Sequence, residues 1–448
     1  MLRIAFLCLA SLATATTARP LGVSADWHRL TVTINPEAGT IAIDDLWRPI
    51  RHGPTHQASF LLSPLYSEPV VAPTCNGNLL TVTSLSSTDD SGDRRWTVGF
   101  SETCPSNSAL TLRITATSKG AAPQLKVDNR GAFAGSGGEI WYPQSAYANR
   151  ESGELRIAAP LGWTVWATGT PIDKYRTTFR ISNPSKLSFA AGDYREMKRS
   201  PIDHVRILTR IAGNEASALG AEIERVDRAL VRTFGKRASN RFALIEVDFG
   251  EQVAGTSEHG AIFTEQQKLS GAFDLPYWAH EIGHQWWGVD ISTEPATPAR
   301  TLLTEGASEY GALAAIRALR GDGAAEKYAA TLREKFKSLP ASARTRALAR
   351  FSPSSQYEIL DAHRLATSRG ALALDCAAEN WGRDAFNRAL ARFARLHRNS
   401  MTSWAALEEH LTSERPQLGR LFEAWLHTES DVLPNCDLPV SQSGSSLK

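Results

Sequence analysis

The stretch YWAHEIGHQWWG at residues 277–288 places His280 and His284 four positions apart, with Glu281 directly after the first histidine. On an α-helix, residues i and i+4 lie on one face, so two imidazoles can bind one metal ion while the carboxylate stays near its water. This spacing is the signature of a zinc hydrolase, and it requires a helix here. The alternative is a surface helix with a hydrogen-bonded histidine pair.

Composition is that of a globular protein with more than one domain. The 448 residues exceed what one hydrophobic core usually supports, and 42% of them are hydrophobic while 21% are charged. The 49 basic residues against 47 acidic ones leave a formal charge of +2. No basic stripe of the kind that neutralises phosphates is visible, so nucleic acid is not expected as a partner.

The first 18 residues predict a secretory signal peptide. Arg3 precedes a short apolar run at residues 4–12, which is followed by small residues suited to cleavage. A membrane anchor is the alternative, but the run is well short of the ~20 residues that span a bilayer. The mature protein is therefore expected to be exported, periplasmic or secreted, without stable insertion in a membrane.

Cleavage of this segment removes Cys8 and leaves four cysteines. An even number of cysteines in an exported chain favours disulfides. We predict that Cys75 pairs with Cys104 and Cys376 with Cys436, since each pair then falls within one expected domain. Buried free thiols are the alternative, and none of the spacings suggests a cysteine metal site.

Residues 19–202 are expected to form an N-terminal β domain. Short runs rich in β-branched residues alternate with Gly, Pro, Asn and Asp turns, which is typical of an antiparallel sheet in a saddle or sandwich. The runs are residues 28–34, 39–43, 79–84, 95–100, 109–115, 155–158, 163–166 and 176–181. No catalytic constellation is visible among them.

The second part of the chain, residues 203–436, is expected to be mainly helical. Strands at 205–211 and 242–248 flank an apolar stripe at helical spacing from Leu219 to Val231. Further helices are predicted at residues 305–320, 323–337, 362–380, 383–397, 403–412 and 418–427. The tail at residues 437–448 is expected to be disordered.

A catalytic zinc ion usually takes three protein ligands and leaves one position for water. Trp287 and Asp290 occupy the positions where metzincins carry a glycine and a third histidine, which excludes that class. The other arrangement takes a glutamate from a following helix. The stretch TEGASEYG at residues 304–311, with Glu305 and Glu309, is the obvious source.

At these residues the chain resembles the aminopeptidase N family of zinc metallopeptidases. The family motif HExxHQW(F/W)G is matched at residues 280–288, and LTEGASEY at 303–310 looks like the phrase LNEGFAEY that carries the third zinc ligand. The resemblance implies that Glu305 is this ligand, with Glu309 as its rival. Twenty residues separate Glu305 from His284, two more than in the family, which we attribute to an insertion around residues 294–298.

GTSEH at residues 255–259 resembles the family's exopeptidase motif GAMEN, in which Gly255 and Glu258 are the matching positions. The resemblance implies that Glu258 binds the free amino group of the substrate. A carboxylate held near the metal would select a cationic N-terminus and set the register of cleavage. An ordinary edge strand with an exposed glutamate is the alternative.

Segments at residues 369–374, 381–386 and 421–425 also look like helical segments of the family. The resemblance implies an α+β fold, in which an N-terminal antiparallel β saddle or sandwich precedes a thermolysin-like, mainly helical zinc metallopeptidase domain. The larger helical C-terminal domain of longer members is expected to be missing.

One residue departs from the family. Thr367 stands where the family has a tyrosine whose hydroxyl stabilises the oxyanion of the tetrahedral intermediate. Losing one such donor typically lowers turnover by about 10²–10³-fold. Tyr357, ten positions earlier, and His363, one helical turn before Thr367, are the residues that could substitute; otherwise both are bystanders.

The sequence therefore predicts a monomeric zinc-dependent aminopeptidase that acts on peptides with a free N-terminus. His280, His284 and Glu305 would bind one zinc ion, and Glu281 would act as general base. A zinc endopeptidase that does not use Glu258 is one alternative. A zinc-stabilised peptide-binding protein with impaired catalysis is the other.

Overall fold

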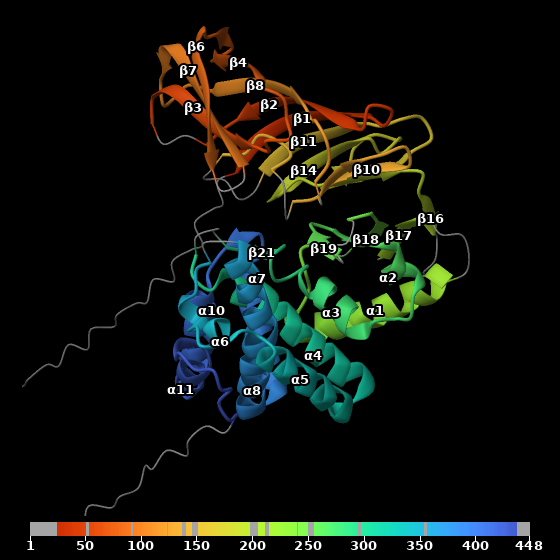
Figure 1. The fold of residues 1–448 in the computed structure, drawn as a ribbon, viewed down its shortest axis with the longest axis vertical. Coiled ribbons are helices and arrows are strands. Elements are labelled where there is room, and N and C mark those ends of the chain that lie inside the picture. Colours follow the sequence, from red (N-terminus) through yellow and green to blue (C-terminus); the bar gives the residue numbers. More distant parts are fainter. Residues whose placement is uncertain are drawn as a thin grey trace, which may run out of the picture.

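The computed structural model describes residues 25–50, 53–90, 93–122, 124–136, 140–145, 151–197, 205–210, 215–239, 241–249, 255–293, 297–353 and 356–436. The predicted signal peptide, the predicted disordered tail and residues 294–296 of the insertion lie outside these ranges. A β-rich domain sits on a mainly helical domain, with a mixed sheet at their junction (Figure 1). The α+β fold predicted from the sequence is confirmed.

The largest sheet of the N-terminal domain has eight strands among the described residues. Their order across the sheet is β13 (Thr170–Pro171), β14 (Thr178–Ser185), β11 (Glu151–Ala158), β1 (Asp26–Asn35), β2 (Thr40–Arg48), β8 (Leu110–Thr117), β4 (Val70–Cys75) and β5 (Asn78–Leu79). Neighbours are antiparallel except β1 and β11, which run parallel. This pair corrects the expectation of a purely antiparallel sheet, and the long chain segment between the two strands supplies the crossover that parallel pairing requires.

Two smaller sheets complete this domain. One contains β3 (Thr55–Leu62), β7 (Asp93–Cys104) and β6 (Val82–Asp90), and the other contains β12 (Thr164–Ala167), β15 (Phe189–Gly192), β10 (Gly131–Ala134) and β9 (Leu125–Val127). Alternate residues of β1 are buried, as a strand with one core-facing side requires. The predicted disulfide between Cys75 and Cys104 is present and links β4 to β7.

A five-stranded sheet lies at the junction of the domains. It contains β16 (Arg195–Met197), β17 (Val205–Thr209), β18 (Phe242–Glu246), β20 (Ala261–Thr264) and β19 (Gly255–Glu258). Phe133 and Trp166 of the N-terminal domain pack against Phe263 of this sheet, with ring centroids 6.2 Å and 5.5 Å away. Strand β16 precedes the domain boundary expected at 202/203, whereas the other four strands follow it. The sheet therefore contains strands from both sides of the expected boundary.

The rest of the second domain is helical. Its α-helices are α1 (Glu215–Phe234), α2 (Gln266–Ser270), α3 (Leu275–Gly283), α4 (Ala307–Arg320), α5 (Asp322–Lys337), α6 (Ala341–Arg344), α7 (Gln356–Leu365), α8 (Ala371–Trp381), α9 (Arg383–Leu396), α10 (Trp404–Glu414) and α11 (Leu418–Phe422). Shorter elements are the π turns η1 (Leu302–Gly306), η3 (Ala366–Gly370) and η4 (Glu423–His427), the 3₁₀ turn η2 (Leu348–Arg350), and the strands β21 (Ile291–Ser292) and β22 (Ser400–Met401). In the described ranges, no helix has both the length and the apolar character needed to cross a membrane.

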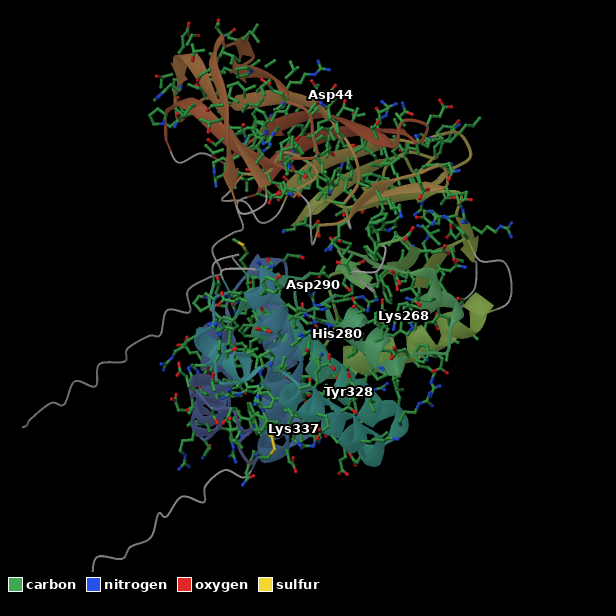
Figure 2. All side chains as sticks on the ribbon, viewed as in Figure 1. Asp44, Lys268, His280, Asp290, Tyr328 and Lys337 are labelled. Carbon is green, nitrogen blue, oxygen red and sulfur yellow. A yellow bond between two sulfur atoms is a disulfide. The ribbon has the colours of Figure 1, made fainter. Side chains whose placement is uncertain are left out.

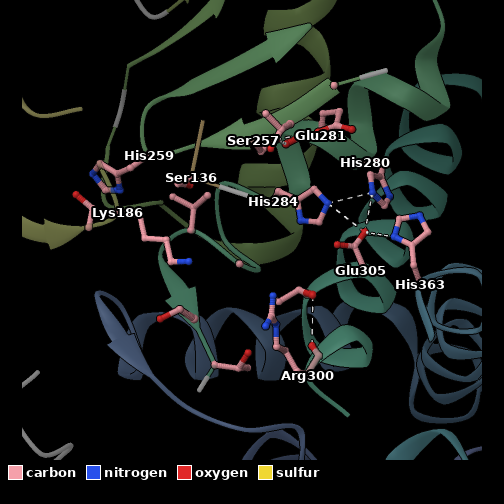
Figure 3. A pocket seen from close by; sticks show the side chains of 18 residues that line it. Ser136, Lys186, Ser257, His259, His280, Glu281, His284, Arg300, Glu305 and His363 are labelled. Carbon is pink, nitrogen blue, oxygen red and sulfur yellow. Dashed lines mark hydrogen bonds and ion pairs between the residues drawn. The ribbon is translucent and has the colours of Figure 1, made fainter. Parts of the chain in front are cut away.

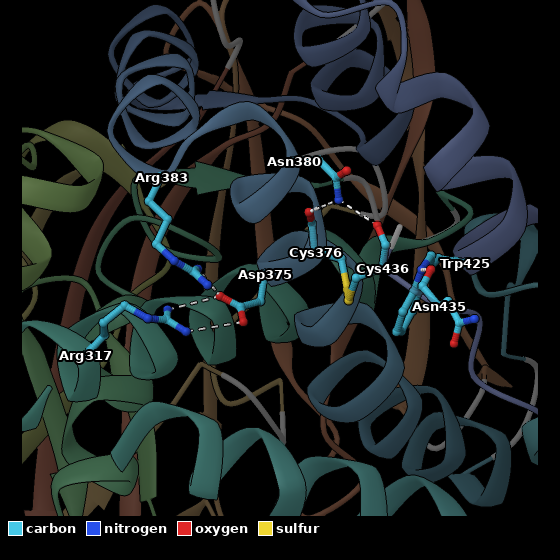
Figure 4. Close-up of a disulfide and its surroundings, with 8 residues drawn as sticks. All are labelled: Arg317, Asp375, Cys376, Asn380, Arg383, Trp425, Asn435 and Cys436. Carbon is cyan, nitrogen blue, oxygen red and sulfur yellow. Dashed lines mark hydrogen bonds and ion pairs between the residues drawn. A yellow bond between two sulfur atoms is a disulfide. The ribbon is translucent and has the colours of Figure 1, made fainter. Parts of the chain in front are cut away.

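The second predicted disulfide, between Cys376 and Cys436, is also present (Figure 4). It fastens the end of the described chain to α8. The side-chain amide of Asn380 donates hydrogen bonds to the carbonyl oxygens of both cysteines, at 2.8 Å and 2.6 Å. The C-terminal segment is therefore held on the helical domain by covalent and polar contacts together.

Candidate metal centre

Helix α3 carries the histidine pair. The Asp274 carboxylate caps its N-terminus by accepting a hydrogen bond from the backbone N–H of Tyr277 (3.2 Å). Trp278 is fully buried and anchors one face of the helix, which leaves His280 and His284 together on another face. Their Nε2 atoms lie 3.0 Å apart. Figure 2 shows His280 in the helical domain, below the β domain.

Hydrogen bonds at Nδ1 fix the tautomer of both imidazoles. His280 Nδ1 lies 2.7 Å from Glu309 Oε2, and His284 Nδ1 lies 2.9 Å from the carbonyl oxygen of Trp287. Both partners are acceptors, so each Nδ1 carries a proton, and in the neutral imidazole each Nε2 presents a lone pair. Two lone pairs 3.0 Å apart repel each other unless a cation lies between them. The pair is therefore arranged as two metal ligands.

The site also favours positive charge electrostatically. Burial disfavours a charged His280, yet hydrogen bonds with Glu305 and Glu309 raise its pKa well above the ordinary value. Burial would likewise raise the pKa of Glu305, but His284 and His280 hold it well below its usual range. Glu305 is therefore an anionic carboxylate, the form that binds a metal ion.

Glu305 completes the cluster from η1, the π turn just ahead of α4. Its Oε2 lies 3.3 Å from His280 Nε2 and 3.4 Å from His284 Nε2. Ligands placed tetrahedrally around zinc at about 2.1 Å are about 3.4 Å apart. The three donor atoms thus stand close to the spacing that zinc requires. A π turn aims this carboxylate at the histidines, and such turns are frequent at functional sites.

Glu309, the rival ligand, lies behind His280 in the structure. It accepts from His280 Nδ1, and the hydroxyl of Tyr328 donates to its other oxygen at 2.5 Å. The described donor atoms that gather within 4.8 Å of one another here belong to His280, His284 and Glu305. Glu309 therefore contacts His280 from behind and lies outside this cluster of candidate ligands.

Replacing Glu309 by glutamine is expected to weaken zinc binding by about 10–100-fold, because the amide supports the His280 tautomer less strongly. Competition with a coloured chelator measures the affinity. Glu326→Gln, on the exposed face of α5, is the matched control. Equal affinities in the two variants would contradict the orienting role.

The carboxylate of Glu281 lies beside this cluster and lines the cleft. The hydroxyl of Ser257, on β19, is 2.9 Å from Glu281 Oε2 and 2.7 Å from its backbone carbonyl. A serine hydroxyl donates to one of these acceptors at a time, and either contact ties α3 to the sheet. Glu281 is therefore held in a fixed orientation next to the ligand cluster.

Of the residues considered as oxyanion donors, the structure brings only His363 to the ligands. Its Nδ1 lies 3.3 Å from Glu305 Oε2, and it lines the cleft (Figure 3). Thr367 is 1% exposed, and its hydroxyl accepts from Lys335 Nζ (2.7 Å) and donates to the carbonyl of His363 (2.9 Å). Tyr357 is 85% exposed and is not part of the cleft wall.

Gly255 and Glu258 lie on β19, at the edge of the junction sheet. A Cβ atom on Gly255 would lie 2.2 Å from the hydroxyl of Tyr277, so any larger residue there would require Tyr277 to shift. Glu258 is 1% exposed, which excludes the exposed edge-strand alternative. Its carboxylate accepts hydrogen bonds from Ser136 N–H (2.9 Å), Ser136 Oγ (2.5 Å) and Ser188 Oγ (2.6 Å). The carboxylate lies behind Ser136, which itself lines the cleft.

The cleft has a volume of ≈ 320 Å³ and is lined by both domains. The N-terminal domain contributes Ser136, Ser185 and Lys186, and Arg300 enters from the segment before η1. The sequence alone did not point to these residues. They belong to no motif, and the fold brings them to the site from distant parts of the chain.

The fold is shared with solved zinc peptidases. An M1 zinc metallopeptidase from Deinococcus radiodurans has a TM-score of 0.70 at 18% identity, covering 94% of this chain and 97% of that chain. A mutant of that protein bound to a Tyr-Ser-Ala substrate has a TM-score of 0.72 at 17% identity, with the same coverage. Native leukotriene A4 hydrolase from Saccharomyces cerevisiae has a TM-score of 0.74 at 13% identity, covering 92% of this chain and 68% of that chain.

No protein-family model matches the sequence, and no curated protein matches it. The comparison with solved structures, at 13–18% identity, concerns the fold. The shared fold confirms the resemblance to the zinc metallopeptidases that the motifs indicate. The matched region includes both domains.

Proposed function

We propose that this chain, which has the fold of the M1 zinc metallopeptidases, is a zinc-dependent aminopeptidase exported from the cytoplasm. The observation that carries the proposal is the cluster of His280, His284 and Glu305, whose donor atoms have zinc-like spacing. Zinc held there would polarise the scissile carbonyl and lower the pKa of a water molecule. The two disulfides support an oxidising compartment.

Glu281 is the general base in this proposal. It accepts a proton from the attacking water and passes it to the leaving amine. Ser257 keeps the carboxylate oriented while it does so. His363, on the side of Glu305, donates a hydrogen bond to the developing oxyanion in place of the family's tyrosine.

Recognition of the substrate amine is assigned to Ser136 together with Glu258. Because Ser136 Oγ donates its proton to the buried carboxylate, its lone pairs are left to accept from an ammonium group in the cleft. Glu258 lies on the side of Ser136 that faces away from the cleft, and its negative charge makes Ser136 Oγ a stronger acceptor. This pair supports a preference for free N-termini.

Paired peptides that differ only in N-terminal acetylation test the proposal. The zinc-loaded protein is expected to hydrolyse the free peptides and to leave the acetylated ones intact, because an acetyl group removes the ammonium charge. Chromatography of the products, with metal content measured on the same sample, gives the result. Cleavage of both members at internal bonds would instead identify an endopeptidase.

One observation favours a second function, that of a zinc-stabilised peptide-binding protein. The hydroxyl of Thr367, at the place of the family's oxyanion donor, is buried and already hydrogen-bonded to Lys335 and His363. Under this alternative, zinc binds stoichiometrically and raises the melting temperature, yet no peptide of a library is hydrolysed.

A further inference from the structure

Two cationic side chains line the cleft on the side away from His363. Lys186 lies between β14 and β15 of the N-terminal domain, and Arg300 lies just ahead of η1, which carries Glu305. Figure 3 shows the ammonium and guanidinium groups pointing into the same part of the cleft, near His284. The two domains thus each bring one positive charge to the substrate cavity.

No carboxylate of the described residues lies within ion-pair distance of Lys186 or Arg300. Glu305 and Glu281 line the same cleft but are engaged with the histidines and with Ser257. Glu258 is already hydrogen-bonded by serine donors. In the described part of the chain no carboxylate is therefore paired directly with either cation, and Glu258 and Glu305 act on them only from a distance.

Both cations are accessible from the cleft, but the surrounding protein makes their charges costly. The protein around the cleft displaces solvent from both groups, which lowers the pKa of each, and the charge of Arg300 lowers the pKa of Lys186 further. The distant carboxylates of Glu258 and Glu305 act in the opposite direction, Glu258 on Lys186 and Glu305 on Arg300. An anion between the two groups would relieve this repulsion. A guanidinium and an ammonium group that converge suit a carboxylate, since the guanidinium can donate to both of its oxygens.

We infer that Lys186 and Arg300 form a subsite for a carboxylate of the substrate. This inference rests on the proposed peptide hydrolysis, because the subsite lies in the same cleft as the metal ligands. The carboxylate has two sources in peptides, which are an acidic side chain at the N-terminal residue and the C-terminus of a very short peptide. In both cases, the enzyme prefers a substrate that places a negative charge close to the scissile bond.

Two arms of matched substrates test the subsite in the zinc-loaded full chain. Glutamyl- and glutaminyl-p-nitroanilide compare a charged side chain with a neutral one, and alanyl-alanine and its amide compare the C-terminus. In at least one arm, kcat/KM is expected to favour the acid by roughly 10–100-fold. Lys186→Met and Arg300→Met, made separately, are each expected to lower that ratio about tenfold or more. Lys119→Met, at an exposed position of the N-terminal domain, should leave the ratio unchanged.

The same ligand pairs are titrated calorimetrically into the zinc-loaded Glu281→Gln variant, which separates binding from hydrolysis. Hydrolysis without any acid preference, in both arms, would overturn the subsite and leave the peptidase assignment standing. Absence of hydrolysis together with tighter binding of the acids, lost on substituting Lys186 or Arg300, would support the subsite and refute the assignment. Equal binding of acid and amide would overturn the subsite whatever the activity.

Discussion

Replacing Glu281 by glutamine is expected to lower kcat by about 10²–10⁴-fold, the usual contribution of general acid–base catalysis, while zinc stays bound. Glutamine has the same shape, and its side-chain oxygen can still accept from the Ser257 hydroxyl that lies 2.9 Å from Glu281 Oε2. It cannot take up the proton of the attacking water. Metal content and steady-state kinetics on the same preparation separate loss of the base from loss of the metal.

Ser257→Ala gives a graded comparison for this variant. Removing one hydrogen bond costs about 1 kcal/mol, so a roughly fivefold decrease in kcat is expected there. The two substitutions should lower kcat by different factors but affect the same step. Wild-type turnover by Glu281→Gln would refute the role of general base, whereas loss of zinc from that variant would show that the carboxylate supports the metal site instead.

The cluster of candidate ligands could be predicted from sequence because its geometry is local. His280 and His284 are one helical turn apart, and the periodicity alone places them on one face. Glu305 lies in the next helical segment, so the candidates for the third ligand were Glu305 and Glu309 of one short stretch. The longer helices were also predictable, because each carries a continuous apolar stripe that must be buried. The short helices α2 and α6 and the first part of α7 were not predicted. The π turns were not predictable, since one extra residue in a helical turn leaves no mark on that pattern.

Long-range contacts account for what the sequence did not indicate. Lys186 precedes His280 by 94 residues, and no spacing rule connects them. The parallel pairing of β1 with β11 depends on the path of the whole sheet and not on either strand. The position of Glu258 behind Ser136 is of the same kind, because the serines come from a different domain. The motif match indicated Glu258 but could not predict that Ser136 would lie between its carboxylate and the cleft.

A buried cluster in the N-terminal domain leads to the second large prediction. His28 on β1 is fully buried, with Nδ1 2.7 Å from Asp45 Oδ2 and Nε2 3.2 Å from Glu151 Oε2. Asp26 and Tyr142 also face this cluster, and the carboxylates of Asp26, Asp45 and Glu151 are inaccessible to solvent. The charge of Lys186 acts on Glu151 from a greater distance. One imidazolium thus neutralises part of the negative charge that three strands bring together.

The pKa shifts give the sign of the pH dependence in the wild-type protein. Burial alone would lower the pKa of His28, but Asp45 and Glu151 raise it from 6.5 to about 10. Its stabilising contribution is therefore complete below 6.5 and is lost as the pH rises through about 10. Burial raises the pKa of Glu151 from 4.5 to about 7, so this group makes the fold less stable as the pH rises across that interval.

Replacing His28 by leucine is expected to lower the free energy of unfolding by about 3–5 kcal/mol near neutral pH, because Asp45 and Glu151 lose their buried cation. The deficit relative to wild type should shrink toward about pH 4, where the carboxylates are more readily protonated in the unfolded chain as well. Urea unfolding at several pH values measures both effects. His56→Leu, at an exposed position of β3, should change stability little. If the two leucine variants are equally stable, His28 is not the neutralising cation of this cluster, and the carboxylates must be buried in their protonated form.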